Sequence, residues 1–202
     1  MNLRTELPTA ENSCNFNAVA DAVTKAGTTL ENLKAAVAGE TGASAKYAAF
    51  AKAAKEQGFD QLARLWEATS AAEQIHINLE ASLVEAEDPS YTRPTAEAPT
   101  PEAIDLNLIA SANGEIFETS DMYPTFIKKA QEEGHAKAVK VFTRAKLAEA
   151  VHAEKYLEAY NNIDAADDDA YYLCPGCGYI HKGDDFEKCP ICGVPKAKFQ
   201  RF

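Results

Sequence analysis

The sequence predicts a mainly α protein, a four-helix bundle with a long crossover that is followed by a small C-terminal metal-binding domain. Four stretches are rich in Ala, Leu, Lys and Glu, which favour helix. The pattern Glu-x-x-His occurs in the second stretch and again in the fourth, so the two halves of the bundle repeat each other. Two Cys-x-x-Cys pairs follow near the C-terminus, in a segment without helical periodicity.

The first two helices are expected to form a hairpin. Residues 1–27 lack a clear helical pattern and are expected to form an irregular N-terminal arm, with the bundle over residues 28–161. The first helix is predicted from about Thr28 to Gln57, with Gly58 as its stop, because glycine tolerates the backbone conformation that ends many helices. The second is predicted over residues 60–85. So short a connection predicts antiparallel neighbours.

A proline-rich connection separates the second and third helices. Its sequence, EDPSYTRPTAEAPTP, contains four prolines, which disfavour helix. About 14 extended residues reach ~45 Å at ~3.3 Å per residue, and a helix of about 27 residues is ~40 Å long. The connection can therefore run the length of the bundle, which allows the third helix to start at the opposite end.

The remaining elements are two helices, a linker and the C-terminal domain. Helices are predicted over residues 101–133 and 135–161, and Pro124 is expected to kink the first of these or to break its hydrogen bonds. The stretch NNIDAADDDA supplies an acidic linker, residues 162–169, before the domain of residues 170–202. Because acidic residues repel one another, we expect this linker to hold the domain away from its own bundle.

Composition narrows the possible partners. The 202-residue chain is 46% hydrophobic and carries a formal net charge of −11, which argues against nucleic acid and against anionic membranes as partners. The N-terminal residues lack an apolar segment of signal-peptide length, and no run approaches ~18 apolar residues, so we expect a cytoplasmic protein. Cys14 stands alone in a polar stretch and is expected to be an ordinary free thiol.

Seven residues of the bundle form a candidate metal site. A Glu and a His three residues apart share one helix face and can reach the same ion. A single Glu-x-x-His in a helix is most often a solvated ion pair, but here each copy follows an upstream glutamate, at 33 residues in the first half and 31 in the second. Carboxylates with imidazole suit iron or manganese, and the pattern is similar to ferritin-like di-iron bundles. The candidate ligands are Glu40, Glu73, His76, Glu115, Glu118, Glu149 and His152. The other two histidines, His135 and His181, are expected to have surface roles.

Four cysteines form a second candidate site. Cys174 and Cys177 occur in CPGCGY, and Cys189 and Cys192 in CPICG, with eleven residues between the inner pair. Four thiolates at this spacing, in a domain too small for a good core, predict one tetrahedral metal. The spacing does not choose between iron and zinc. Iron beside a di-iron site would make a redox relay, whereas a structural zinc would only hold the domain together.

Together these motifs resemble the rubrerythrin family over roughly residues 28–202. The resemblance rests on AGETGASAKY around Glu40, on EQIH, GEIFETSDMYP and EAVH in the later helices, and on the two cysteine motifs. It implies a ferritin-like di-iron bundle with a rubredoxin-like tail, two irons in the bundle and one in the cysteine cage. By the same match, the hydroxyls of Tyr47 and Tyr123 bond ligating carboxylates and belong with the seven ligands in the catalytic site. Glu115 and His76 would exchange at one iron as its oxidation state changes.

The resemblance also implies a function. The expected activity is reduction of hydrogen peroxide to water, in oxidative stress defence, with electrons from an external NADH-linked reductase or a rubredoxin. The family's head-to-tail homodimer would bring one chain's tail to the other chain's bundle, so a homodimer or larger even assembly is expected. Two alternatives stay open, a ferritin-like iron oxidation and storage protein and an inert bundle with a structural zinc ribbon.

Overall fold

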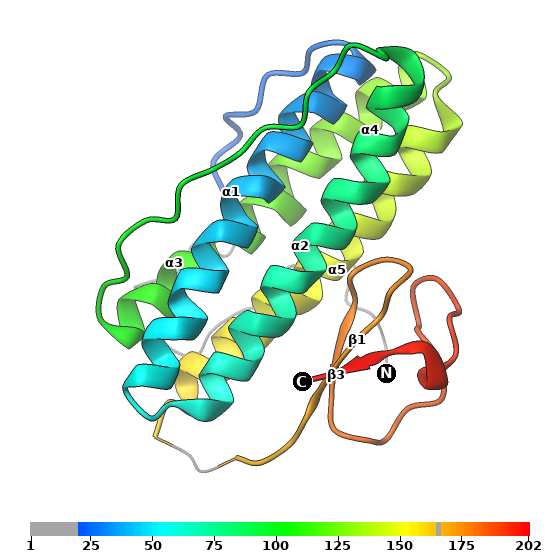
Figure 1. Ribbon diagram of the computed structural model, residues 1–202. Helices are drawn as coiled ribbons and strands as arrows, with labels where there is room; N and C mark the ends of the chain where they lie inside the picture. Colours follow the sequence, from blue (N-terminus) through cyan, green and yellow to red (C-terminus); the bar gives the residue numbers. More distant parts are fainter. Residues whose placement is uncertain (1–19, 165–166) are drawn as a thin grey trace.

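The computed structural model describes residues 20–164 and 167–202 and shows a long helical bundle with a small β domain against its side (Figure 1). Helices α1 (Thr29–Glu56) and α2 (Asp60–Glu87) form the expected antiparallel hairpin. Thr28 and Glu31 form a capping box at the start of α1, which satisfies backbone N–H groups that the first turn leaves unpaired. Gly58 closes the hairpin at a φ of +83°, a conformation that favours glycine.

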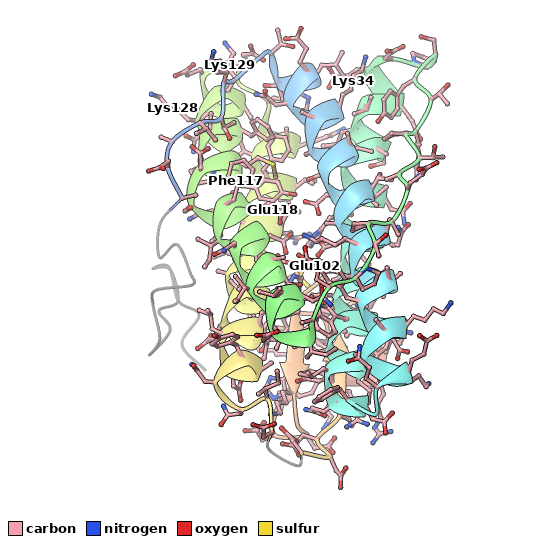
Figure 2. The ribbon with its side chains drawn as sticks, turned by 90° about the vertical axis from the view of Figure 1, so that its left-hand side faces the viewer. Lys34, Glu102, Phe117, Glu118, Lys128 and Lys129 are labelled. Atoms are coloured by element: carbon pink, nitrogen blue, oxygen red, sulfur yellow. The ribbon has the colours of Figure 1, made fainter. Side chains whose placement is uncertain are left out.

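The crossover of residues 88–103 runs along the outside of α1 to the opposite end of the bundle, as its length allows (Figure 1). Near its start, Arg93 pairs with Glu85 at 2.6 Å. The ring of Tyr91 packs on the apolar cluster of Val37, Ile77 and Ala81. In Figure 2, Glu102 marks the far end of the crossover, where the chain turns into the third helical stretch.

The third helical stretch consists of α3 (Ile104–Phe117), the π-helical segment η2 (Glu118–Met122) and α4 (Tyr123–Glu132). The disturbance expected at Pro124 is therefore a widened π turn immediately before it. The N–H of Tyr123 reaches back five residues to the carbonyl of Glu118, and the proline occupies the first turn of α4, where its missing N–H is tolerated. After Gly134, helix α5 (Ala136–Asn161) completes the bundle.

The end of the N-terminal arm is fastened to the π segment. The backbone N–H groups of Val23 and Thr24 both donate to Oδ2 of Asp121, at 3.1 and 2.8 Å. The N–H of Ala20 donates to the hydroxyl of Ser120. Residues 1–19, which include Cys14, lie outside the described part of the chain.

The two largest apolar clusters of the bundle lie one toward each end. The first contains Phe50, Trp66 and Tyr156, and the second contains Leu33 and Phe142. Helices α1, α2 and α5 and the stretch from α3 to α4 each pass from one cluster to the other. All of the candidate bundle ligands lie on these helices between the two clusters. The core therefore contains a buried polar layer between the two apolar clusters, which separate this layer from bulk water.

The tail is a three-stranded antiparallel sheet with a short 3-10 turn. Strands β1 (Tyr171–Leu173), β2 (Ile180–Lys182) and β3 (Gln200–Arg201) lie in the order β2-β1-β3, and η3 (Lys196–Lys198) precedes β3. The loop between β1 and β2 contains the first cysteine pair, and the second pair follows β2. Among the described helices, none is long and apolar enough to cross a membrane.

The tail packs against its own bundle, so the expected separation by the acidic linker is wrong. Tyr171, Leu173 and Ile180 join the apolar cluster of Phe50 and Trp66, and strands β1 and β2 contact α2. Lys182 pairs with Glu158 of α5 and with Asp167 of the linker. Apolar burial and these ion pairs outweigh the repulsion among the acidic residues of the linker.

Candidate functional site

The polar layer brings the Glu-x-x-His residues of both halves into one buried box. One group of potential ligand atoms comes from Glu40, Glu73, His76 and Glu149, and a second from Glu73, Glu115, Glu149 and His152. Within each group the atoms lie within 4.8 Å of one another. Glu73 and Glu149 belong to both groups, so their carboxylates lie where they can bridge two ions. The box is therefore a double site with two shared carboxylates.

The two histidines point the same ring nitrogen into the box. Nδ1 of His76 lies 3.0 Å from Glu73 and 2.7 Å from Glu149. Nδ1 of His152 lies 2.7 Å from the other oxygen of Glu149. The rings are stacked with their centroids 6.2 Å apart. The i, i+3 spacing on α2 and α5 places each histidine beside a glutamate of its own helix, and antiparallel packing brings the two pairs together.

The other ring nitrogen of each histidine faces the tail. Nε2 of His76 lies 3.0 Å from the carbonyl oxygen of Cys177, and Nε2 of His152 lies 2.9 Å from that of Gly178. A carbonyl only accepts, so each Nε2 donates its hydrogen and each Nδ1 keeps a lone pair for a metal. An outer acceptor of this kind is typical of metal-ligating histidines. The sequence did not show that the tail would supply it.

The electrostatics of the box favour bound cations. Oxygens of Glu40, Glu73, Glu115, Glu118 and Glu149 and the Nδ1 of His152 are buried without a hydrogen-bond partner. Burial raises the pKa of Glu115 to about 8, helped by the charges of Glu73 and Glu149. Burial also raises the pKa of Glu40 and Glu118 well above the usual range, with further contributions from neighbouring carboxylates. Carboxylates crowded together away from water fit metal binding, and this donor set suits iron or manganese.

Two buried tyrosines hold carboxylates of the box. The hydroxyl of Tyr47 donates to Oε1 of Glu115 at 2.6 Å. The hydroxyl of Tyr123 contacts Oε1 of Glu40 and also lies 2.9 Å from Oε1 of Glu80. The sequence reasoning missed Glu80, which is fully buried although it belongs to neither metal group. Its spacing, four residues after His76 on the same helix, could have revealed it.

Glu118 lies at the edge of the box, on the π segment. It belongs to neither compact group, and its Oε2 has no hydrogen-bond partner. Figure 2 labels it on the stretch between α3 and α4, beside α1. Its charge helps to raise the pKa of Glu40, and the charges of Glu115 and Glu149 help to raise its own, so it lies close to both groups. Glu115 is grouped with His152, so this arrangement does not pair Glu115 with His76 at one ion as expected.

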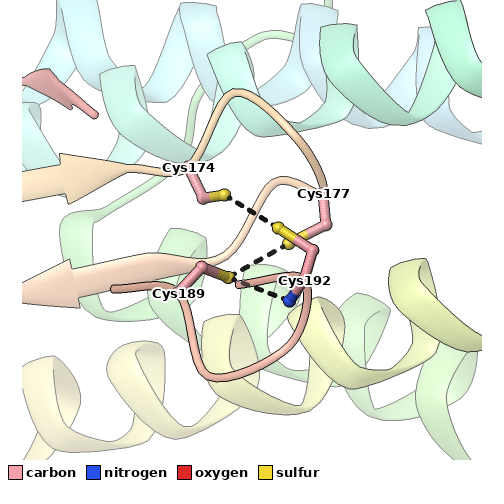
Figure 3. A group of neighbouring side chains, drawn as sticks. All are labelled: Cys174, Cys177, Cys189 and Cys192. Carbon is pink, nitrogen blue, oxygen red and sulfur yellow. Dashed lines mark hydrogen bonds between the residues drawn. The ribbon is translucent and has the colours of Figure 1, made fainter. Parts of the chain in front are cut away.

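The four tail cysteines form a compact cage (Figure 3). The sulfurs of Cys174 and Cys192 lie 3.4 Å apart, and those of Cys177 and Cys189 lie 3.5 Å apart. All four are free thiols, and the N–H of Cys192 points at the sulfur of Cys189. Four sulfurs gathered around one point fit a single tetrahedral metal, either iron or zinc.

The histidines outside the box have different roles. His135 caps α5, because its Nδ1 accepts a hydrogen bond from the N–H of Ala138. His181 is buried, which contradicts the expected surface role. Its ring lies between the hydroxyl of Tyr179 at 3.0 Å and the carboxylate of Asp185 at 2.8 Å, and these two partners make burial of the imidazole tolerable.

Comparison with known proteins agrees with this geometry. The family model described as Rubrerythrin matches residues 31–160, and the model described as Rubrerythrin, rubredoxin-like domain matches residues 172–200. The chain is 67% identical to nigerythrin of Nitratidesulfovibrio vulgaris, with all of both chains covered. It is 34% identical to rubrerythrin of the same organism, covering 87% of this chain and 95% of that one. The solved structure of nigerythrin in its fully reduced, all-ferrous state matches with a TM-score of 0.90, at 67% identity and full coverage of both chains. The chain therefore belongs to the rubrerythrin family.

Proposed function

We propose that this protein reduces hydrogen peroxide to water in the bundle, with electrons that enter through the cysteine cage. Proteins of the rubrerythrin family are di-iron peroxidases with a rubredoxin-like domain. One observation carries the proposal for this chain. Both histidines of the box donate to carbonyls of the first cysteine loop, so the two metal sites are joined by hydrogen bonds.

The residues present fit three metal ions. Glu40, Glu73, Glu115, Glu149, His76 and His152 would hold two irons, with Glu118 close by, and the four cysteines would hold a third. Irons held in the box would supply the electron pair that reduction of peroxide consumes, and an iron in the cage would supply single electrons to replace it. Reduction of one peroxide to two waters consumes two electrons and two protons.

The chain's own residues prepare the site for this chemistry. The apolar clusters at both ends keep bulk water out, which strengthens every electrostatic interaction inside. Tyr47 and Tyr123 donate to carboxylates of the box and restrict their rotation. His76 offers a short route for electrons, from the sulfur of Cys177 through its backbone carbonyl to Nε2. Iron storage would need the box but would have no use for this route.

Removing a shared carboxylate should empty the box. We expect Glu73→Ala or Glu149→Ala to lower the iron content of the bundle from about two ions to one or fewer and to abolish peroxide turnover, because each carboxylate serves both positions. Metal analysis after anaerobic iron reconstitution, with peroxide consumption, checks this. Lys52→Ala, an exposed position on α1, is the control. Full iron content and turnover in both glutamate variants would contradict the assignment, and uptake of iron far beyond three per chain without turnover would favour storage.

We also propose a reducing, cytoplasmic location and an external electron donor, either a reductase or a rubredoxin. The two Cys-x-x-Cys pairs are arranged as a metal cage, and paired Cys-x-x-Cys motifs bind metal more often than they form disulfides in a reducing cytosol. An iron held by four cysteine thiolates would accept one electron at a time, which suits a donor that delivers single electrons.

We further propose that the chain forms a homodimer or a larger even assembly in which tails are exchanged. Residues 162–169 connect α5 to β1, and exchange at this connection would reproduce between two copies every contact that one tail makes with its own bundle. The contacts of Cys177 and Gly178 with the two histidines would then cross between subunits.

Mixing two inactive variants tests the exchange. Cys174→Ser removes a cage ligand and leaves the bundle intact, whereas Glu149→Ala disables the bundle and leaves the cage intact. If tails are exchanged, co-refolded mixtures should regain part of the steady-state peroxide turnover with an external reductant. Each variant refolded alone is the control. Absence of recovery in proven hetero-dimers would place electron transfer within one chain.

A further inference from the structure

Glu80 is a buried acid that the proposed chemistry does not use. It lies on α2, one turn after His76, and its side chain is fully buried. Its Oε1 lies 2.9 Å from the hydroxyl of Tyr123, and its Oε2 has no hydrogen-bond partner. Burial of a carboxylate is costly, so a position of this kind calls for an explanation.

Tyr123 is shared between two carboxylates. Its hydroxyl contacts Glu40, a residue of the box, as well as Glu80. A phenol carries one hydrogen, so it cannot donate fully to both acceptors at the same time. The two carboxylates therefore compete for one donor. Glu115 on the other side of the box receives its bond from Tyr47, a different tyrosine.

The competition matters because Glu40 is a candidate ligand. A hydrogen bond donated to a carboxylate stabilises its negative charge and lowers its basicity, which weakens its hold on a cation. When the hydroxyl turns toward Glu80, Glu40 regains that charge. We propose that Glu80 is a positioning residue that draws the Tyr123 hydroxyl away from Glu40 and thereby strengthens metal binding at the Glu40 position. This inference rests on the proposed function only in requiring that the bundle binds iron.

A plain charge effect predicts a different pattern. A buried negative charge near the box attracts a cation directly, whether or not Tyr123 is present. The hydrogen-bond effect requires the hydroxyl of Tyr123. A double-mutant cycle between the two positions separates these effects, because it isolates the part that depends on both residues.

The experiment measures ferrous iron affinity under anaerobic conditions, by competition with a coloured chelator. We expect Glu80→Leu, which removes the acceptor at a similar size, to weaken the binding of one of the two bundle irons by on the order of fivefold, the size expected for one hydrogen bond. In the Tyr123→Phe background the same substitution should have less than about half of that effect. Equal losses in the two backgrounds, or no loss in either, would overturn the proposal.

A second variant guards against misfolding and against the charge effect. Glu80→Asp keeps the acidic group but withdraws it from the hydroxyl of Tyr123, so it should resemble Glu80→Leu. Affinity like that of the unaltered protein would overturn the proposal in favour of charge alone. Near-native fluorescence of the buried Trp66, the chain's single tryptophan, verifies the fold of each variant. Failure of the unaltered protein to bind two irons would overturn the proposed function as well, whereas normal binding with unaffected variants would overturn only the role of Glu80.

Discussion

Replacing Gly178 with alanine should disconnect the cage from the bundle. A Cβ at this position would overlap Nε2 of His76 and lie 2.9 Å from its Cε1. The residue also has a φ of +76°, where a side chain is strained. The tail would have to move away, so the hydrogen bonds of His76 and His152 to the cysteine loop would be lost. We expect the cage to load iron, and electron transfer from cage to bundle, followed by stopped-flow absorption, to slow by about tenfold or more.

Gly183→Ala is the matched control for this prediction. Gly183 lies in the same domain at a φ of +83°, and the nearest atom to a Cβ there is a side-chain oxygen of Asp185 at 3.8 Å. Alanine at position 183 therefore has the same backbone strain as alanine at position 178 but no clash with a neighbouring side chain. In both variants, peroxide should still oxidise a chemically prereduced bundle site in a single turnover. That reaction does not need electrons from the cage. Slowing of similar size in the two variants would show that strain and not contact with His76 is responsible.

Removing the metals should make the stability of the bundle strongly dependent on pH. In the metal-free protein, burial raises the pKa of Glu115 and of Glu80 to about 8, and the pKa values of Glu40 and Glu118 are also raised. The unfolded chain titrates these groups near 4.5, so between about pH 4.5 and 8 the folded state binds more protons. The free energy of unfolding therefore falls as pH rises through this window, by at most about 1.4 kcal/mol per pH unit for each group.

Histidine titration acts in the same direction. Carboxylates raise the pKa of His76 and His152 although burial opposes this, so these rings also release protons on unfolding as pH rises. Thermal unfolding followed by Trp66 fluorescence should show a falling Tm from about pH 5 to 8 without metal and a much flatter profile with iron bound. Glu115→Gln should reduce the slope of the metal-free protein. Equal slopes with and without metal would show that the box is not a metal site.

The sequence was sufficient to predict the bundle because its signals are local. Helical stretches end at Gly58 and Gly134, and both glycines have positive φ values in the structure. The repeated Glu-x-x-His pattern marks a helix face, and antiparallel packing of α2 and α5 brings the two copies together without further information. The cysteine spacing predicts a cage in the same way, because two short loops are enough to gather four sulfurs.

The contacts that connect the two sites could not be predicted in this way. The acceptors for His76 and His152 are backbone carbonyls of Cys177 and Gly178, and every residue carries a carbonyl. Charge repulsion in the linker suggested a detached tail, but apolar strand residues such as Ile180 are buried against the bundle. Such long-range packing has no local signature in the chain.

Glu80 and the π turn at Glu118 are two further features of the site that local sequence patterns do not show. Glu80 lies outside the Glu-x-x-His pattern and was not identified from the sequence, although it is buried and shares a helix face with His76. The π turn over Glu118–Met122 is a one-residue widening of the helix, which is not visible in residue spacing. The grouping of Glu115 with His152 depends on how the helices pack, and residue spacing does not show that either.

The most direct test of the relay is the order in which the two sites are oxidised. Fully reduced, iron-loaded protein is mixed anaerobically with a limiting amount of peroxide, and absorption of the cage and of the bundle site is followed by stopped-flow. The account predicts that the bundle site oxidises first and that the cage follows only through it, so Glu149→Ala should leave the cage reduced. Oxidation of the cage by peroxide at an unchanged rate in Glu149→Ala would contradict the central claim that electrons pass from the cage, through its contact with His76, to the bundle.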